Sequence, residues 1–114
     1  MISHTVVFRF RDEVAGADRD DVLAEVARFP DHFPAMRRFR LGANRSTRDD
    51  RMSHGFFVEF DDEDALARYL ASDRHERFVR ERWRPVIADQ AIVTIETPVP
   101  SVEPTPESEG TVRE

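Results

Sequence analysis

Residues 53–79 read SHGFFVEFDDEDALARYLASDRHERFV, and this stretch decides which fold the chain can adopt. Its first part alternates, so that one side of a predicted strand carries a histidine and three apolar residues: His54, Phe56, Val58 and Phe60. Asp61 then stands where a helix N-cap belongs, and the acidic residues after it complement the positive end of the helix dipole. The stretch therefore predicts a strand, a capped helix, a break near residues 72–73 and a second helix.

The rest of the chain supplies three more strands and one more helix. Strands are predicted at about residues 1–10, 36–44 and 91–97, because apolar and polar residues alternate there. A helix is predicted from Asp18 or Asp20 to about Arg28, and the proline-flanked segment after it is predicted to be irregular. The order β-α-β-β-α-β is typical of the α+β ferredoxin-like fold, an antiparallel sheet with helices on one face.

Two of these strands carry the same pattern, a histidine followed by apolar residues at every second position. They are headed by His4 and His54. We expect the first and third strands to lie side by side and parallel in the middle of the sheet, which would bring the two histidines to one end. The helix after Phe60 should then run back along its strand and deliver Tyr69 and His75 to the same place.

The second face of the sheet has no predicted helix to cover it. That face is expected to carry apolar side chains from three strands: Thr5, Val7, Phe57 and Val93 or Ile95. Because an exposed apolar sheet face usually marks a partner surface, we predict a homodimer formed sheet to sheet.

Composition excludes several classes of function. The 114 residues contain no cysteine, and all 17 basic side chains are arginines, so cysteine nucleophiles, disulfides and lysine Schiff bases are impossible. The net charge of −6 argues against nucleic acid as a partner. No membrane span or signal peptide is recognised, which predicts a cytoplasmic protein. We expect one domain over residues 1–97 and a disordered acidic tail, rich in Pro, Glu, Ser and Thr, over residues 98–114.

The expected convergence of reactive groups predicts a catalytic site. A histidine in this place can act as a general base, and the hydroxyl of Tyr69 can donate to a developing enolate oxygen. Substrate-binding roles are assigned to two histidines and to the apolar residues expected beneath or beside them: His4, His54, Val6, Phe8, Phe56, Val58, Phe78 and Trp83. The alternative interpretation is structural, with hydrogen-bonded strand histidines, a packed tyrosine ring and phenylalanines that form only the core. No metal site is expected, because no two histidines have a close ligand spacing.

The chain resembles the stress-responsive dimeric α/β barrel (Dabb) family. The resemblance depends on ISHTVVFRFRDEV (2–14), FPAMRRFRLGAN (33–44), SHGFFVEFDDEDALARYL (53–70) and on His75 followed by Phe78. It implies a dimeric α/β barrel joined through its sheets, in agreement with the fold predicted above. In a plant polyketide cyclase of this family, a tyrosine and a histidine six positions later act in an aldol-type ring closure with the histidine as base, so the resemblance implies that Tyr69 and His75 are catalytic and that His75 is the general base. Family members often have His-Pro-x-His after the tyrosine, whereas this chain has Ser72 and Asp73, which predicts a less rigid turn.

Three functions remain open from the sequence. The first is a cofactor-independent lyase or cyclase that abstracts a proton alpha to a carbonyl of a small apolar, oxygenated ligand, such as a polyketide. The second is a non-enzymatic, stress-related dimer that binds a hydrophobic ligand or a protein. The third is a cofactor-free monooxygenase, since oxygenases of antibiotic biosynthesis share this barrel architecture.

Overall fold

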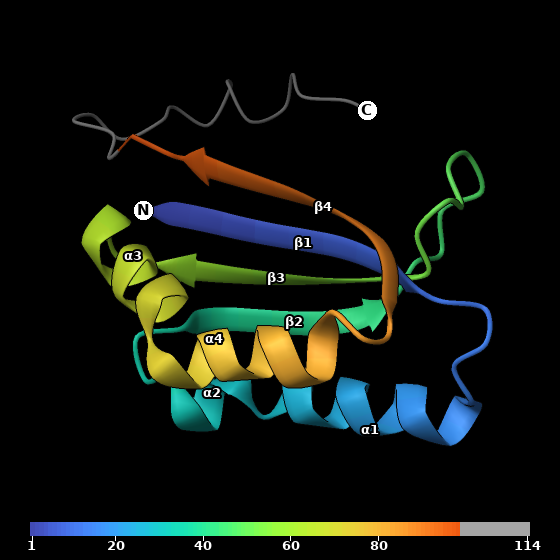
Figure 1. The fold of residues 1–114 in the computed structure, drawn as a ribbon. Coiled ribbons are helices and arrows are strands. Elements are labelled where there is room, and N and C mark those ends of the chain that lie inside the picture. Colours follow the sequence, from blue (N-terminus) through green and yellow to red (C-terminus); the bar gives the residue numbers. More distant parts are fainter. Residues whose placement is uncertain (99–114) are drawn as a thin grey trace.

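The computed structural model describes residues 1–98, and its elements follow the predicted order with one short helix added (Figure 1). The strands are β1 (Ile2–Phe10), β2 (Arg37–Ala43), β3 (His54–Phe60) and β4 (Ile87–Glu96). The helices are α1 (Gly16–Ala27), α2 (Phe29–His32), α3 (Glu63–Ala71) and α4 (Asp73–Phe78), and α4 continues as the π-helix η1 (Val79–Trp83). The tail predicted to be disordered lies outside the described residues from position 99 onward.

The four strands form one sheet in the order β2-β3-β1-β4, and every neighbouring pair is antiparallel. This confirms the α+β ferredoxin-like fold, but the prediction that β1 and β3 run parallel is wrong. Each strand–helix–strand unit joins two parallel strands, β1 to β2 and β3 to β4. The connection between β2 and β3 reverses the chain, so β3 has to run opposite to β1.

The helices cover one face of the sheet and form the core with it. Figure 1 shows α1, α2 and α4 along the sheet, and α3 at the end where β3 finishes and the N-terminus lies. The most deeply buried side chains come from β1, β3 and α1: Ile2, Phe8, Val22, Val26, Val58 and Phe60. On the other face, the side chains of Val93 and Ile95 are 52% and 56% exposed, which confirms the predicted uncovered apolar surface.

Helix ends differ from the sequence prediction at three places. α1 begins at Gly16 without a side-chain cap, so neither Asp18 nor Asp20 is its N-cap. The segment after α1 forms α2 rather than irregular chain, because Pro30 lies in its first turn, where a missing N–H costs nothing. Burial of Phe29 fixes this short helix against the core.

The N-cap of α3 is Asp62 and not Asp61. The Asp62 carboxylate accepts a hydrogen bond from the backbone N–H of Ala65 at 2.9 Å. Asp61 instead forms a bidentate ion pair with Arg37, with N–O distances of 2.7 and 3.0 Å, and so connects the end of β3 to the start of β2.

The expectation that one helix returns along β3 is also wrong. α3 ends at Ala71 while it still lies beside the end of β3, where the Tyr69 and Phe60 rings are 5.5 Å apart. Instead, α4 and η1 together run back along the sheet. At their end Trp83 packs against Phe8 at 4.7 Å between ring centroids and donates its indole N–H to Gln90 at 2.8 Å.

Within residues 1–98, none of the helices has the length and apolar character that a membrane crossing requires.

Candidate active site

Three of the predicted site residues come together at one end of the sheet. His4 is on β1, Tyr69 is on the last turn of α3, and His75 is on α4. The Tyr69 ring lies 4.5 Å from the His75 ring and 6.4 Å from the His4 ring, measured between centroids. The structure therefore places two imidazoles near one phenol.

His54 is not part of this cluster. In the antiparallel register His54 is opposite Phe8, whereas His4 is opposite Val58. Four residues of strand, at about 3.3 Å each, separate the two histidines by about 13 Å along the sheet. His54 stacks on Phe8 at 5.7 Å and shares a 2.8 Å hydrogen bond between its Nδ1 and the Ser53 hydroxyl. The expected meeting of the two strand histidines is wrong, because it depended on parallel strands.

Ser72 connects Tyr69 to His75 through one hydroxyl group. It donates a hydrogen bond to the Tyr69 carbonyl oxygen at 2.8 Å and accepts one from the His75 backbone N–H at 3.1 Å. Ser72 thus closes α3 and caps α4. The turn at residues 72–73, which was expected to be less rigid, is therefore fixed by hydrogen bonds to both helices.

The ring of His75 is held in one tautomer. Its Nδ1 lies 3.1 Å from the Leu70 carbonyl oxygen, which can only accept, so Nδ1 carries the proton and Nε2 is free to accept one. Burial lowers the pKa of His75 below its ordinary value, although the hydrogen bond to Leu70 and the charge of Glu76 oppose this shift. A neutral imidazole with a free Nε2 is the form that a general base requires.

His4 is buried and has one hydrogen-bond partner. Its side chain is only 4% exposed, and its Nδ1 lies 3.0 Å from the hydroxyl oxygen of Thr94 on β4. Burial, followed by the nearby His75, lowers the pKa of His4. Sequence reasoning missed Thr94. The one available signal was that a residue with a hydroxyl group stands in the alternating pattern of a strand that could pair with β1.

Tyr69 is enclosed by aromatic rings, with Phe33 at 4.8 Å and Phe29 at 6.3 Å between centroids. Burial raises its pKa above the ordinary value, so the phenol keeps its proton at neutral pH. Among the described residues, neither the Tyr69 hydroxyl nor Nε2 of His4 has a hydrogen-bond partner. No side-chain nitrogen or oxygen in this part of the chain is both completely buried and without a hydrogen bond.

The apolar residues assigned to a substrate pocket form part of the core, and the three of them that also border hollows, Phe56, Phe78 and Trp83, do so at three separate hollows that none of the clustered residues lines. All six are buried: Val6, Phe8, Phe56, Val58, Phe78 and Trp83. Their role in substrate binding remains a prediction.

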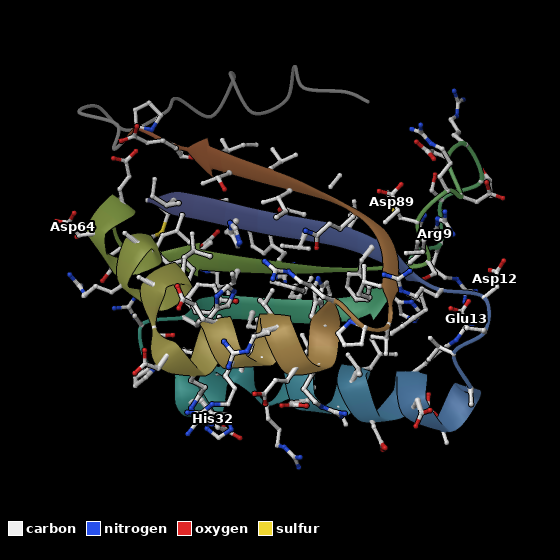
Figure 2. All side chains as sticks on the ribbon, in the orientation of Figure 1. Arg9, Asp12, Glu13, His32, Asp64 and Asp89 are labelled. Atoms are coloured by element: carbon white, nitrogen blue, oxygen red, sulfur yellow. The ribbon has the colours of Figure 1, made fainter. Side chains whose placement is uncertain are left out.

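Two of the hollows in the described residues border the helices. A hollow of about 310 Å³ is lined by Leu70, His75, Glu76, Val79, Arg80 and Arg84. A second, of about 210 Å³, lies between α1, α2 and α4, with Phe29, His32, Arg74 and Arg77 among its lining residues. Figure 2 shows His32 of this second hollow projecting from α2, away from the sheet.

The largest hollow, about 910 Å³, lies at the other end of the sheet, where it is lined by His54 and by open-face residues that include Val7 and Phe57. Only His75 of the three clustered residues borders any of these hollows. No group of three or more His, Asp or Glu side chains in residues 1–98 is arranged to hold a metal ion.

Fold and site together define a small α+β protein of ferredoxin-like topology with a His-Tyr-His cluster at one sheet end, in which His4 and Tyr69 are buried and His75 is partly exposed. The family model for the stress-responsive A/B barrel domain, Dabb, matches residues 2–97, and the chain belongs to this family. No curated protein matches the sequence significantly.

Solved structures of the same fold extend the comparison. A Dabb family protein with a ferredoxin-like fold from Mesorhizobium loti is 26% identical with a TM-score of 0.76, over 87% of this chain and 97% of that one. A dimeric ferredoxin-like protein of unknown function from Thermobifida fusca is 21% identical with a TM-score of 0.71, over 84% and 90%. The hydroxynitrile lyase of Passiflora edulis is 17% identical with a TM-score of 0.76, over 87% and 96%, and this likeness shows the fold alone.

Proposed function

We propose that the protein is a cofactor-independent lyase or cyclase that abstracts a proton alpha to a carbonyl group. The observation that carries the proposal is the Tyr69–His75 pair, with ring centroids 4.5 Å apart and a proton held on Nδ1 of His75 by the Leu70 carbonyl. One protein of the same fold, from Passiflora edulis, is a hydroxynitrile lyase, so the architecture is compatible with this class of chemistry.

The proposed reaction starts with proton transfer to Nε2 of His75, which gives an imidazolium and an enolate. Tyr69 donates a hydrogen bond to the enolate oxygen, and its raised pKa means that it does so without losing its own proton. The enolate carbon attacks a second carbonyl carbon of the same molecule, forming the ring bond. The imidazolium then returns its proton to the new alkoxide, so that charges and protons balance. His4 orients the substrate through its free Nε2.

The test is enzyme-dependent exchange of α-hydrogens with D₂O in a linear methyl triketone, together with ring closure of that compound, followed by NMR. We expect both activities from the native protein, and a loss of at least about 100-fold, the lower range for a lost acid–base group, in His75→Ala and Tyr69→Phe. Circular dichroism checks that both variants stay folded. Unchanged exchange in both variants would rule out the mechanism.

A second function, a dimer that binds an apolar ligand without reaction, is favoured by one observation. Tyr69 and His4 are each 4% exposed, and neither lines a hollow found among the described residues. This function predicts that a ligand still binds to His75→Ala and that no α-hydrogen exchange is detected with the native protein.

The proposed assembly is a homodimer joined through the open sheet face. The Thermobifida fusca protein of the same fold is described as dimeric, and here Val93 and Ile95 leave apolar surface exposed on that face. The cytoplasmic location expected from the sequence stays a prediction.

A further inference from the structure

The hollow beside His75 has an apolar wall and a cationic end. Its apolar part is formed by Leu70, which is 37% exposed, and by Val79. Arg80 lies in η1 and Arg84 directly after it, five and nine residues beyond His75 in the chain. An apolar surface that ends in guanidinium groups fits an amphiphilic molecule with an anionic head.

The two arginines are available to a ligand. Among the described residues, no ion pair involves the Arg84 guanidinium, and only its backbone carbonyl accepts a hydrogen bond, from Arg11. Arg80 contacts Glu81 at 3.3 Å with both side chains more than half exposed, which is a weak pair in water. An incoming carboxylate can therefore replace that contact at little cost.

Glu76 makes the two ends of the hollow different in charge. It adjoins His75 in the chain and lines the same hollow, so negative charge is disfavoured at the His75 end. The anionic group of a ligand is directed to the other end, toward Arg80 and Arg84, while the uncharged part lies at His75.

The helical rise sets the length of such a molecule. Arg80 and Arg84 are five and nine residues beyond His75, which at about 1.5 Å per residue corresponds to about 7 to 13 Å. An extended chain gains about 1.2 Å per bond, so about six to eleven bonds separate the anionic group from the carbon at His75. A hollow of about 310 Å³ is at the lower limit for small-molecule sites, which agrees with a ligand of this size.

We propose that this hollow is the substrate channel that leads to His75 and that it selects apolar chains ending in a carboxylate. Arg80 and Arg84 bind the carboxylate, Leu70 and Val79 contact the chain, and the reacting carbon lies at His75. This inference rests on the proposed function for its chemistry, but the binding geometry can be tested without turnover.

The experiment is an NMR titration of the full-length protein with octanoate and, as a neutral match, octanamide. We expect octanoate to bind more tightly than octanamide and to shift the signals of Leu70, His75 and Val79. Arg84→Gln and Arg80→Gln should each weaken octanoate binding by about three- to tenfold, as expected for an exposed ion pair, and leave octanamide binding unchanged. Arg77→Gln is the matched control, because Arg77 lies on α4 but lines the other hollow.

Three results would overturn the inference: equal affinity for octanoate and octanamide, loss of octanoate binding in Arg77→Gln but not in Arg84→Gln, or no octanoate binding at all. A separate result identifies failure of the proposed function alone. If octanoate binding depends on Arg80 and Arg84 while His75→Ala leaves α-hydrogen exchange unchanged, the channel is correct and the assigned base is wrong.

Discussion

At the scale of single residues, the His4–Thr94 contact links the buried end of the site to the edge strand. Thr94 lies directly opposite His4 in the β1–β4 register, and its hydroxyl is the hydrogen-bond partner of Nδ1. The hydroxyl therefore fixes the orientation of the His4 ring and leaves Nε2 as its other nitrogen. Thr94 therefore has a structural role that the sequence pattern around it does not indicate.

Replacing Thr94 by valine keeps the shape and the β-branching but removes the hydroxyl. We expect the free energy of unfolding to fall by about 1 kcal/mol, because a largely buried imidazole nitrogen loses its partner. Thr94→Ser should retain most of the stability. Urea unfolding at pH 8, followed by the fluorescence of the single tryptophan, measures the difference. A valine variant as stable as the native protein would show that water replaces the hydroxyl.

Burial of His4 also makes stability depend on pH. Its folded pKa is below the unfolded value of about 6.5, so the unfolded chain takes up the proton first. The contribution is therefore fully present above about pH 6.5 and is lost as the pH falls toward the lowered folded pKa. Burial shifts the pKa values of His54 and His75 in the same direction.

We expect the melting temperature to decrease between pH 7.5 and pH 5.5, and His4→Gln to show a shallower decrease because one titrating group is gone. Differential scanning calorimetry at intervals across this range measures both slopes. Comparison at pH 8, where the imidazoles are neutral, separates the loss of charge linkage from any constant loss of packing. Parallel curves for the two proteins would contradict the assigned contribution of His4.

At the scale of elements, Ser72 makes α3 and α4 a single bent unit. Because one hydroxyl serves both helices, Ser72→Ala should destabilise the protein by about 1 kcal/mol, the usual cost of a lost N-cap. Ser72→Asp is the matched variant. A carboxylate can still accept from the His75 N–H but cannot donate to the Tyr69 carbonyl. Chemical unfolding measures stability, and the NMR signal of His75 reports whether its ring moves.

If the aspartate variant restores both the stability and the His75 signal, the cap alone positions the histidine. If it restores stability while the His75 signal remains displaced, the bond to the Tyr69 carbonyl is also needed. An alanine variant identical to the native protein in both measurements would contradict a role for Ser72.

The elements also show how far the sequence determined the fold and the site. Alternation predicted which residues of β1 and β3 face the helices, because period two is a local property. Alternation could not reveal the relative direction of the two strands, because the pattern is the same in either direction. The sequence analysis therefore expected His54 at the wrong end of the sheet. Tyr69 and His75 lie near His4 for a reason other than the predicted one: α3 stays at the end of β3, and the antiparallel β1 begins at that same end. The contact with Thr94 spans 90 residues and depends on strand register, which a single sequence does not give.

At the scale of the whole molecule, β4 is an edge strand with apolar side chains on both faces. Ile92 is opposite Val6 and lies on the helix-covered side, whereas Ile95 is opposite Ser3 and lies on the open side. Their side chains are 53% and 56% exposed, so the isolated protomer does not distinguish them. A sheet-to-sheet dimer does, because only Ile95 would become buried in it.

Ile95→Arg should therefore dissociate the proposed dimer, and Ile92→Arg should not. Burying an unpaired guanidinium in an apolar interface costs about 3 kcal/mol, which weakens association about 100-fold. Sedimentation equilibrium over a range of protein concentrations measures both variants against the native chain, and circular dichroism confirms that each is folded. Because the two positions share a strand, a residue type and an exposure, they differ only in the face they present. Equal effects of the two substitutions, or none, would mean that the open sheet face is not where two copies meet.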